Sequence, residues 1–106
     1  MSEEHIPFYI EPFESNATPF TSEVAEKCLR YHFAQHEELG TITHFNYHGY
    51  YLGDSGRYYH AFGVGMTGNA HGFDWYGAMV ARESITLLNR TLYGDFMSKL
   101  KRLRSI

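Results

Sequence analysis

The segment from residue 41 to residue 67 constrains the fold more than any other part of this chain. It reads TITHFNYHGYYL, then GDSG, then RYYHAFGVGMT. Aromatic and β-branched residues favour strands, and a Gly/Asp/Ser cluster between two such runs indicates a turn. The sequence therefore predicts an antiparallel β-hairpin over residues 41–67, with Asp54 and Ser55 as a two-residue loop.

Strand alternation sorts this hairpin into two faces. With the two-residue loop, Leu52 lies opposite Arg57 and Tyr47 lies opposite Phe62. The face expected to enter the core holds Phe45, Tyr47, Tyr51, Tyr58, His60, Phe62, Val64 and Met66. The other face holds Ile42, His44, Asn46, His48, Tyr50, Leu52, Arg57, Tyr59, Ala61, Gly63 and Gly65. Glycines inside a strand mark a close approach, so either the domain's own helix or a partner is expected against Gly63 and Gly65.

Helical spacing predicts one helix on each side of the hairpin. The first runs over residues 19–39, with Pro19 at its start and Gly40 as its C-terminal cap. The second runs over residues 75–104, because apolar residues recur there every three or four positions. An unbroken helix of that length would measure roughly 45 Å, more than the hairpin needs. We therefore expect its far end to project or to pair with a second copy, forming a homodimer through four apolar residues: Ile85, Leu88, Leu92 and Phe96.

The remaining segments complete a small α+β domain over residues 1–106. Prolines at positions 7 and 12 limit residues 1–18 to an extended arm or an edge strand. Residues 68–74 have the composition of a loop. The expected architecture is an antiparallel hairpin packed against an N-terminal helix and a long C-terminal helix. The N-terminal strand would extend the hairpin to a three-stranded sheet.

Composition narrows the setting in which this chain works. Cys28 is the one cysteine of the chain, which excludes an intramolecular disulfide and a cysteine metal cluster. Small secreted domains are more often stapled by disulfides, so we expect a cytoplasmic protein. The sequence offers no apolar run of membrane-spanning length, so no membrane partner is expected. The net charge of −3 hides an acidic first third and a basic last third, an asymmetry that suits a charged partner or head-to-tail contacts.

Several residue patterns resemble parts of metal, ligand or dinucleotide sites, but none of them completes a site. His32 and His36 are spaced to share one helix face, and His44 and His48 share a strand face, so either pair could begin a metal or small-ligand site. A catalytic metal needs about three ligands, and neither pair supplies them alone. The GVGMTG segment at residues 63–68 matches a dinucleotide-binding pattern but does not lead directly into a helix. We expect no cofactor and no enzymatic activity, because no nucleophile, base and orienting group can be named together.

The expected function is therefore interaction. We predict a small non-enzymatic module, an inhibitor or adaptor that binds and masks a surface of a larger protein assembly, a class that includes many phage-encoded inhibitors. The expected partner-binding residues are Tyr50, Tyr59, Arg57, His44, His48, Trp75 and Tyr76. A metal- or small-ligand-binding domain is one alternative. A dimeric nucleic-acid binder that uses the basic end of the C-terminal helix is another, although the negative net charge disfavours it.

Overall fold

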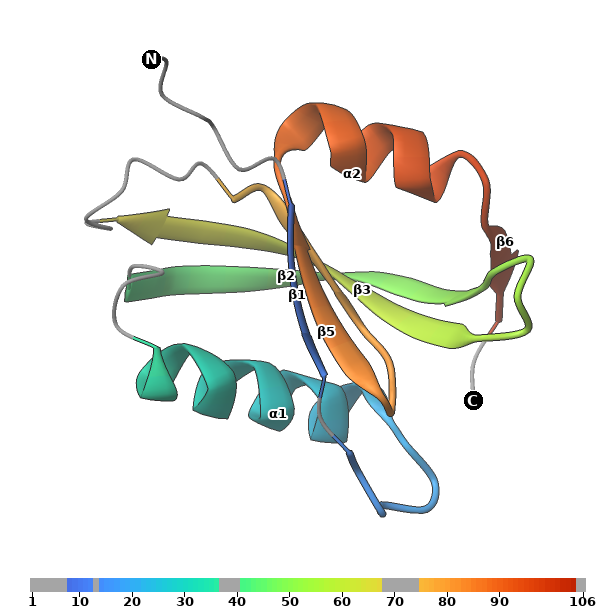
Figure 1. Cartoon of the computed structure of the whole chain (residues 1–106), viewed down its shortest axis with the longest axis horizontal. Coiled ribbons are helices and arrows are strands. Elements are labelled where there is room, and N and C mark those ends of the chain that lie inside the picture. Colours follow the sequence, from blue (N-terminus) through green and yellow to red (C-terminus); the bar gives the residue numbers. More distant parts are fainter. Residues whose placement is uncertain (1–7, 13, 37–40, 68–74, 105–106) are drawn as a thin grey trace.

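The fold is a six-stranded antiparallel sheet with one helix on each face (Figure 1). The computed structural model describes residues 8–12, 14–36, 41–67 and 75–104. Along the chain the elements are β1 (Phe8–Pro12), α1 (Ser22–Gln35), β2 (Thr41–Leu52), β3 (Tyr58–Thr67), β4 (Gly77–Val80), β5 (Ser84–Leu88), α2 (Arg90–Met97) and β6 (Lys101–Leu103). The strand order in the sheet is β1-β5-β4-β3-β2-β6.

The expected long C-terminal helix is wrong. Residues 75–104 instead form β4, β5, the short helix α2 and β6. Every residue of β4 and β5 is buried, because helices or aromatic side chains cover both faces of the sheet there. A strand buried on both faces shows no alternation in sequence, so its apolar residues can be mistaken for a helical stripe. The basic segment after Lys99 is consequently an edge strand and not a helix end.

The expected three-stranded sheet is also wrong. The hairpin of β2 and β3 is present, but β4 pairs with β3 and β6 pairs with β2. The N-terminal strand β1 exists at an edge of the sheet, where it pairs with β5 and not with the hairpin. Helix α1 is shorter than the expected 19–39 and starts after Thr21, whose side chain accepts the Val24 N–H at 3.3 Å. Gly40 and the expected loop over residues 68–74 lie outside the described residues.

Three irregularities give the hairpin faces that simple alternation does not predict. One is a register shift of β2 between Ile42 and His44, and Ile42 packs with Phe45 in the α1 cluster and not on the expected face. The other two lie at the turn and near it. The turn is one residue longer than expected: Gly53 N–H donates to the Arg57 carbonyl at 2.9 Å, and Leu52 pairs with Tyr58. Tyr47 still pairs with Phe62 as predicted, because β2 contains a compensating bulge between Tyr47 and Gly49. A bulge resets the alternation of side chains along a strand.

The bulge changes which aromatic residues share a face. Tyr50 joins Tyr47 and His60 on the α1 side of the sheet, where its ring stacks on His60 with 4.6 Å between centroids. Tyr51 instead packs with Tyr59 on the α2 side. The expected placements of Tyr50 and Tyr51 are therefore both wrong, and each follows from the same inserted residue.

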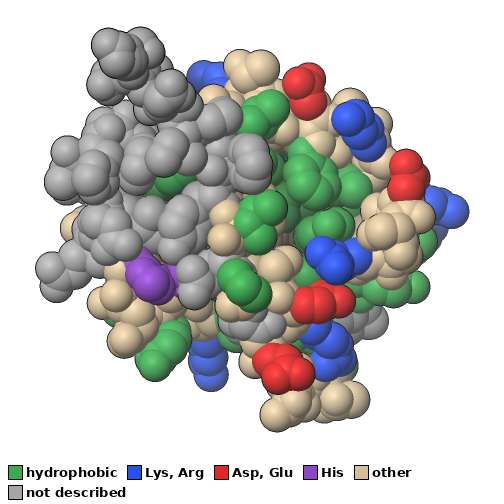
Figure 2. All heavy atoms as spheres, viewed as in Figure 1, with side chains coloured by type: hydrophobic (Ala, Val, Ile, Leu, Met, Phe, Trp, Pro, Cys, Tyr) green, Lys and Arg blue, Asp and Glu red, His purple; other side chains and the backbone are tan. Residues whose placement is uncertain are grey.

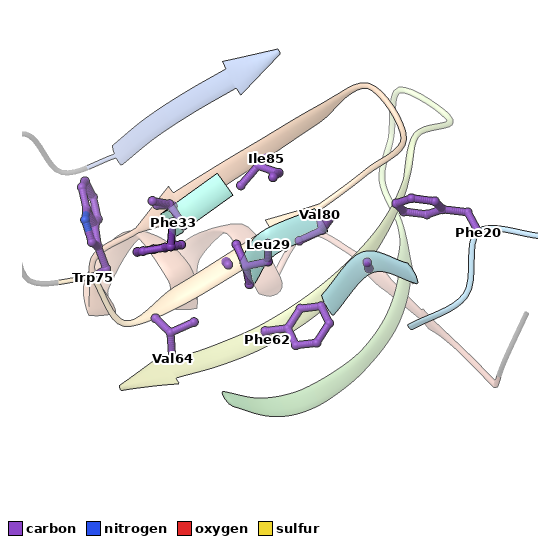
Figure 3. Packing of buried hydrophobic residues seen from close by; sticks show 11 residues of the cluster. Phe20, Leu29, Phe33, Phe62, Val64, Trp75, Val80 and Ile85 are labelled. Carbon is purple, nitrogen blue, oxygen red and sulfur yellow. The ribbon is translucent and has the colours of Figure 1, made fainter. Parts of the chain in front are cut away.

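Two hydrophobic clusters hold the helices on the sheet. The α1 side is filled by side chains from the helix, the strands and the segments that precede them (Figure 3), and the labelled members are Phe20, Leu29, Phe33, Phe62, Val64, Trp75, Val80 and Ile85. The α2 side is smaller and contains Tyr51, Tyr59, Ala61, Met79, Ala81, Leu88 and Tyr93. Helix α1 lies under one part of the hairpin, and the turn of the hairpin extends past it (Figure 1). The turn end of the hairpin therefore offers side chains that α1 does not cover.

Candidate binding surface at the hairpin end

Exposed tyrosine and arginine side chains gather around the half-buried Tyr50 where the hairpin extends past α1. We call this the tyrosine–arginine surface, and it consists of Tyr47, Tyr50, Tyr58, Arg57, Arg82, Arg102 and Arg104. Tyr47 is 47% exposed and Tyr58 is 50% exposed, so both rings present apolar area to the solvent. Tyr50 lies at the centre, because it lines both of the pockets found on this surface.

A row of nearly parallel rings forms the middle of the surface. Tyr50 stacks on Tyr58 with 5.6 Å between centroids and an angle of 20° between the rings. On its other side Tyr50 stacks on His60, its direct cross-strand partner, at 29°. Aromatic cross-strand neighbours stabilise a sheet and restrict one another's rotamers. The Tyr50 ring is thus held in place by rings of its own chain.

His60 is the buried end of this row of rings and holds it in position. It is only 2% exposed, and its Nε2 lies 2.8 Å from the carbonyl oxygen of Phe20. A carbonyl can only accept, so Nε2 carries the proton and Nδ1 accepts a hydrogen bond from the Tyr47 hydroxyl at 2.8 Å. Burial lowers the pKa of His60, with the bond to Phe20 opposing the shift, so the ring is neutral near pH 7.

The first pocket lies on the β6 side of Tyr50 and has a volume of about 290 Å³. Its lining residues are Thr21, Ser22, Tyr47, His48, Gly49, Tyr50, His60, Arg102, Leu103 and Arg104. Burial raises the pKa of Tyr47, and the nearby positive charge of Arg102 partly opposes that rise. Tyr47 and Arg102 thus line the same pocket.

The second pocket lies on the opposite side of Tyr50 and has a volume of about 370 Å³. Arg82 places its guanidinium over the Phe20 ring, 5.5 Å from the centroid, and donates to the Ala17 carbonyl at 2.6 Å. Arg57 lies 3.7 Å from a carboxylate oxygen of Glu83. Both arginines of this pocket are therefore engaged within the chain, although the exposed pair with Glu83 contributes little stability.

The seven residues predicted to bind a partner do not lie on one surface. Tyr50 and Arg57 belong to the tyrosine–arginine surface. Tyr59 and Trp75 are core residues, 9% and 3% exposed. Tyr76 is half-buried on the α2 side, where Arg90 lies over its ring at 4.8 Å from the centroid.

His44 and His48 lie over the strand glycines. A Cβ on Gly63 would approach the His48 ring to 2.6 Å, and the His44 ring lies in the same way against Gly65. His48 also forms a 2.6 Å hydrogen bond between its Nδ1 and the hydroxyl of Tyr93 in α2. The chain's own side chains therefore cover these glycines.

The four residues expected to form a dimer interface are divided between β5 and α2. Ile85 and Leu88 are buried in β5, 1% and 4% exposed, on opposite faces of the sheet. Leu92 and Phe96 are half-buried in α2 and line an apolar groove between this helix and the sheet (Figure 2). A dimer through one continuous helix stripe therefore has no structural basis.

The described part of the chain gives little support to metal binding or to nucleophilic catalysis. His32 in the last turn of α1 and His36 at its C-terminal cap are neighbours, with 4.5 Å between ring centroids. Across residues 8–12, 14–36, 41–67 and 75–104, no group of three or more His, Cys, Asp or Glu residues is arranged to hold a metal ion. Burial raises the pKa of the Cys28 thiol, which disfavours the reactive thiolate.

The hydrogen bond between Tyr47 and His60 has the outline of a nucleophile and a base. The Phe20 carbonyl would orient the imidazole, as a third group does in catalytic sets. Burial, however, raises the pKa of Tyr47 and lowers that of His60, so each shift opposes proton transfer from the phenol to the imidazole. Both side chains therefore favour their neutral forms in this hydrogen bond.

Among the described residues no helix is both long enough and apolar enough to cross a membrane. No protein-family model matches the chain, and neither the curated proteins nor the solved structures contain a match. The arrangement of the side chains is therefore the basis for assigning a function.

Proposed function

We propose that this protein is a small non-enzymatic interaction module that binds and masks an acidic patch of a larger protein assembly through the tyrosine–arginine surface. One observation carries the proposal: Tyr50 stands between two pockets, and each pocket is bordered by a pair of arginines. Tyrosine and arginine are the residue types that most often dominate the energy of protein interfaces.

The charge of the surface supports an acidic partner. Four arginines line the two pockets, and Glu83 is the one carboxylate among the described lining residues. The whole chain has a net charge of −3, so this positive region is local. A local field of this kind steers the orientation in which an acidic surface approaches and raises the association rate.

The rigidity of the surface supports tight binding. Tyr47 is fixed by its bond to His60, and Tyr50 is fixed between two rings. Ordering a side chain on binding costs about 0.5–1.5 kcal/mol, and side chains that are already ordered avoid most of that cost. An inhibitor or adaptor that must occupy its target persistently benefits from such preorganisation.

Charge reversal tests the proposal. Immobilised protein is used to capture partners from native cell extract, with Arg104→Glu and Arg82→Glu as test variants and Lys99→Glu in α2 as the matched control. We expect the same captured protein to be retained by the control and lost by both test variants, with capture weakening as salt rises. Equal retention by all three variants would show that the surface is elsewhere. Capture that disappears after nuclease treatment would replace the protein partner with a nucleic acid.

A further inference from the structure

We propose that the pocket between Tyr47 and Arg102 is a subsite for one oxyanion, a carboxylate or phosphate group. This subsite is part of the proposed binding surface. It rests on the proposed function in one respect, because the partner is taken to present the carboxylate or phosphate group. The pocket volume of about 290 Å³ lies just below the range of about 300–1,000 Å³ that is typical of small-molecule sites. It therefore suits a single functional group better than a whole cofactor.

The charges around the pocket favour an anion. Two of its lining residues are arginines, and none of the described residues that line it carries a carboxylate. Arginine presents five N–H donors in a planar fork that matches carboxylate and phosphate oxygens. The Thr21 side-chain oxygen accepts the Val24 N–H at 3.3 Å, so its own proton is free to serve as a further donor.

The backbone holds one of the two guanidinium groups in position. Arg102 pairs with Tyr51 across the β2–β6 ladder, and its Nη1 lies 3.4 Å from the Tyr51 hydroxyl. Its guanidinium rests against Gly49, where a Cβ would come within 3.1 Å of the guanidinium carbon. Gly49 follows the bulge in β2 and has a φ of +127°, which residues with side chains rarely adopt. The bulge and the glycine together make room for the guanidinium at the edge of the pocket.

The second pocket is the weaker candidate for an anion. Its Arg57 faces Glu83, and its Arg82 already donates to the Ala17 carbonyl. In the first pocket the contact between Arg102 and Tyr51 is long for a hydrogen bond and uses one donor of five. The first pocket therefore retains the donor capacity that a bound oxyanion requires.

Titration followed by nuclear magnetic resonance tests the subsite directly. The probes are inorganic phosphate and sodium acetate, added at constant ionic strength with chloride as the balancing anion. The readouts are the Gly49 amide and the side-chain Nε–H signals of Arg102 and Arg104. We expect saturable shifts of these signals with at least one probe, and a preference between the two probes identifies the group.

Two variants and one control test whether the anion binds in this pocket. We expect Arg104→Gln and Arg102→Gln each to weaken the interaction about tenfold or more, because each removes a charge-assisted hydrogen bond. Lys99→Gln should leave the affinity unchanged. Arg104 follows β6 and is exposed, so its variant keeps the fold even if Arg102→Gln loosens the strand. Shifts that never saturate, or that persist unchanged in Arg104→Gln, would overturn the subsite.

A second comparison identifies the source of the group and separates the two proposals. A short peptide that carries the preferred group should bind more tightly than the free anion if a macromolecule presents it. Anion binding in a protein whose capture experiments fail contradicts the proposed function alone. Partner capture that depends on Arg82, without saturable anion binding, contradicts the subsite alone.

Discussion

Replacing Gly49 by alanine should lower both the stability of the fold and the affinity of the pocket for an anion. Gly49 has a φ of +127°, and a Cβ at this position would lie 3.1 Å from the Arg102 guanidinium. A non-glycine residue at positive φ costs roughly 1–2 kcal/mol, and the displaced guanidinium adds a packing cost of similar size at most. We expect Gly49→Ala to lower the free energy of unfolding by about 1–4 kcal/mol.

Gly56 provides a matched control for this variant. It also has a positive φ, +85°, but a Cβ there would meet nothing within 4 Å. Gly56→Ala should therefore lower stability through backbone strain alone. Urea unfolding measures both stabilities, and phosphate titration measures both affinities. We expect weaker anion binding for Gly49→Ala and unchanged binding for Gly56→Ala. Equal anion binding by the two variants would refute the role of Gly49 in the pocket.

Three further predictions concern residues that stabilise the fold around the tyrosine–arginine surface. Gly63→Ala should destabilise the protein by about 1–3 kcal/mol in urea unfolding, because the new Cβ would lie 2.6 Å from the His48 ring, and adding His48→Ala should restore part of the loss. Burial lowers the folded-state pKa of His60 from 6.5. The contribution of the neutral His60 ring to the free energy of unfolding is therefore fully present above pH 6.5, and it is lost as the pH falls through the lowered pKa. The pH dependence of stability between pH 7 and pH 5 should be shallower in His60→Gln, and an identical slope would contradict this assignment. Asn89→Ala should cost about 1 kcal/mol, measured by thermal unfolding, because the Asn89 side chain caps α2.

The sequence predicts the hairpin well because its signals are local. Aromatic and β-branched runs on both sides of a glycine-rich turn specify strand, turn and strand without reference to the rest of the chain. The pairing of Tyr47 with Phe62 is confirmed. The faces beyond His48 could not be predicted, because a bulge inserts one residue and leaves no distinct signature in composition.

The C-terminal third could not be predicted for a different reason. The segments around Met79 and Leu87 lie in the middle of the sheet, and residues on both of their faces are buried. Alternation is the main sequence signal of a strand, and complete burial removes it. The chance spacing of Ala78, Ile85 and Leu88 then imitates a helix.

The candidate site depends on these same two features. Arg57 is identifiable from the sequence as an exposed hairpin residue. Tyr50 is not, because it is half-buried and lies on the face opposite to the one expected for it. Arg82 and Arg102 reach the surface only because residues 75–104 fold into strands and place β6 beside β2. A continuous helix over residues 75–104 would not place either arginine in a pocket with Tyr50, as the strands do.

Site-specific photo-crosslinking in the native host tests the central claim most directly. Benzoylphenylalanine replaces either Tyr58, 50% exposed on the tyrosine–arginine surface, or Tyr31, 68% exposed on α1. We predict a crosslink from position 58 to an acidic region of one protein, no such crosslink from position 31, and loss of the product when Arg104→Glu is added. The same adduct from both positions, or none from position 58 while position 31 reacts, would contradict the assignment of partner binding to this surface.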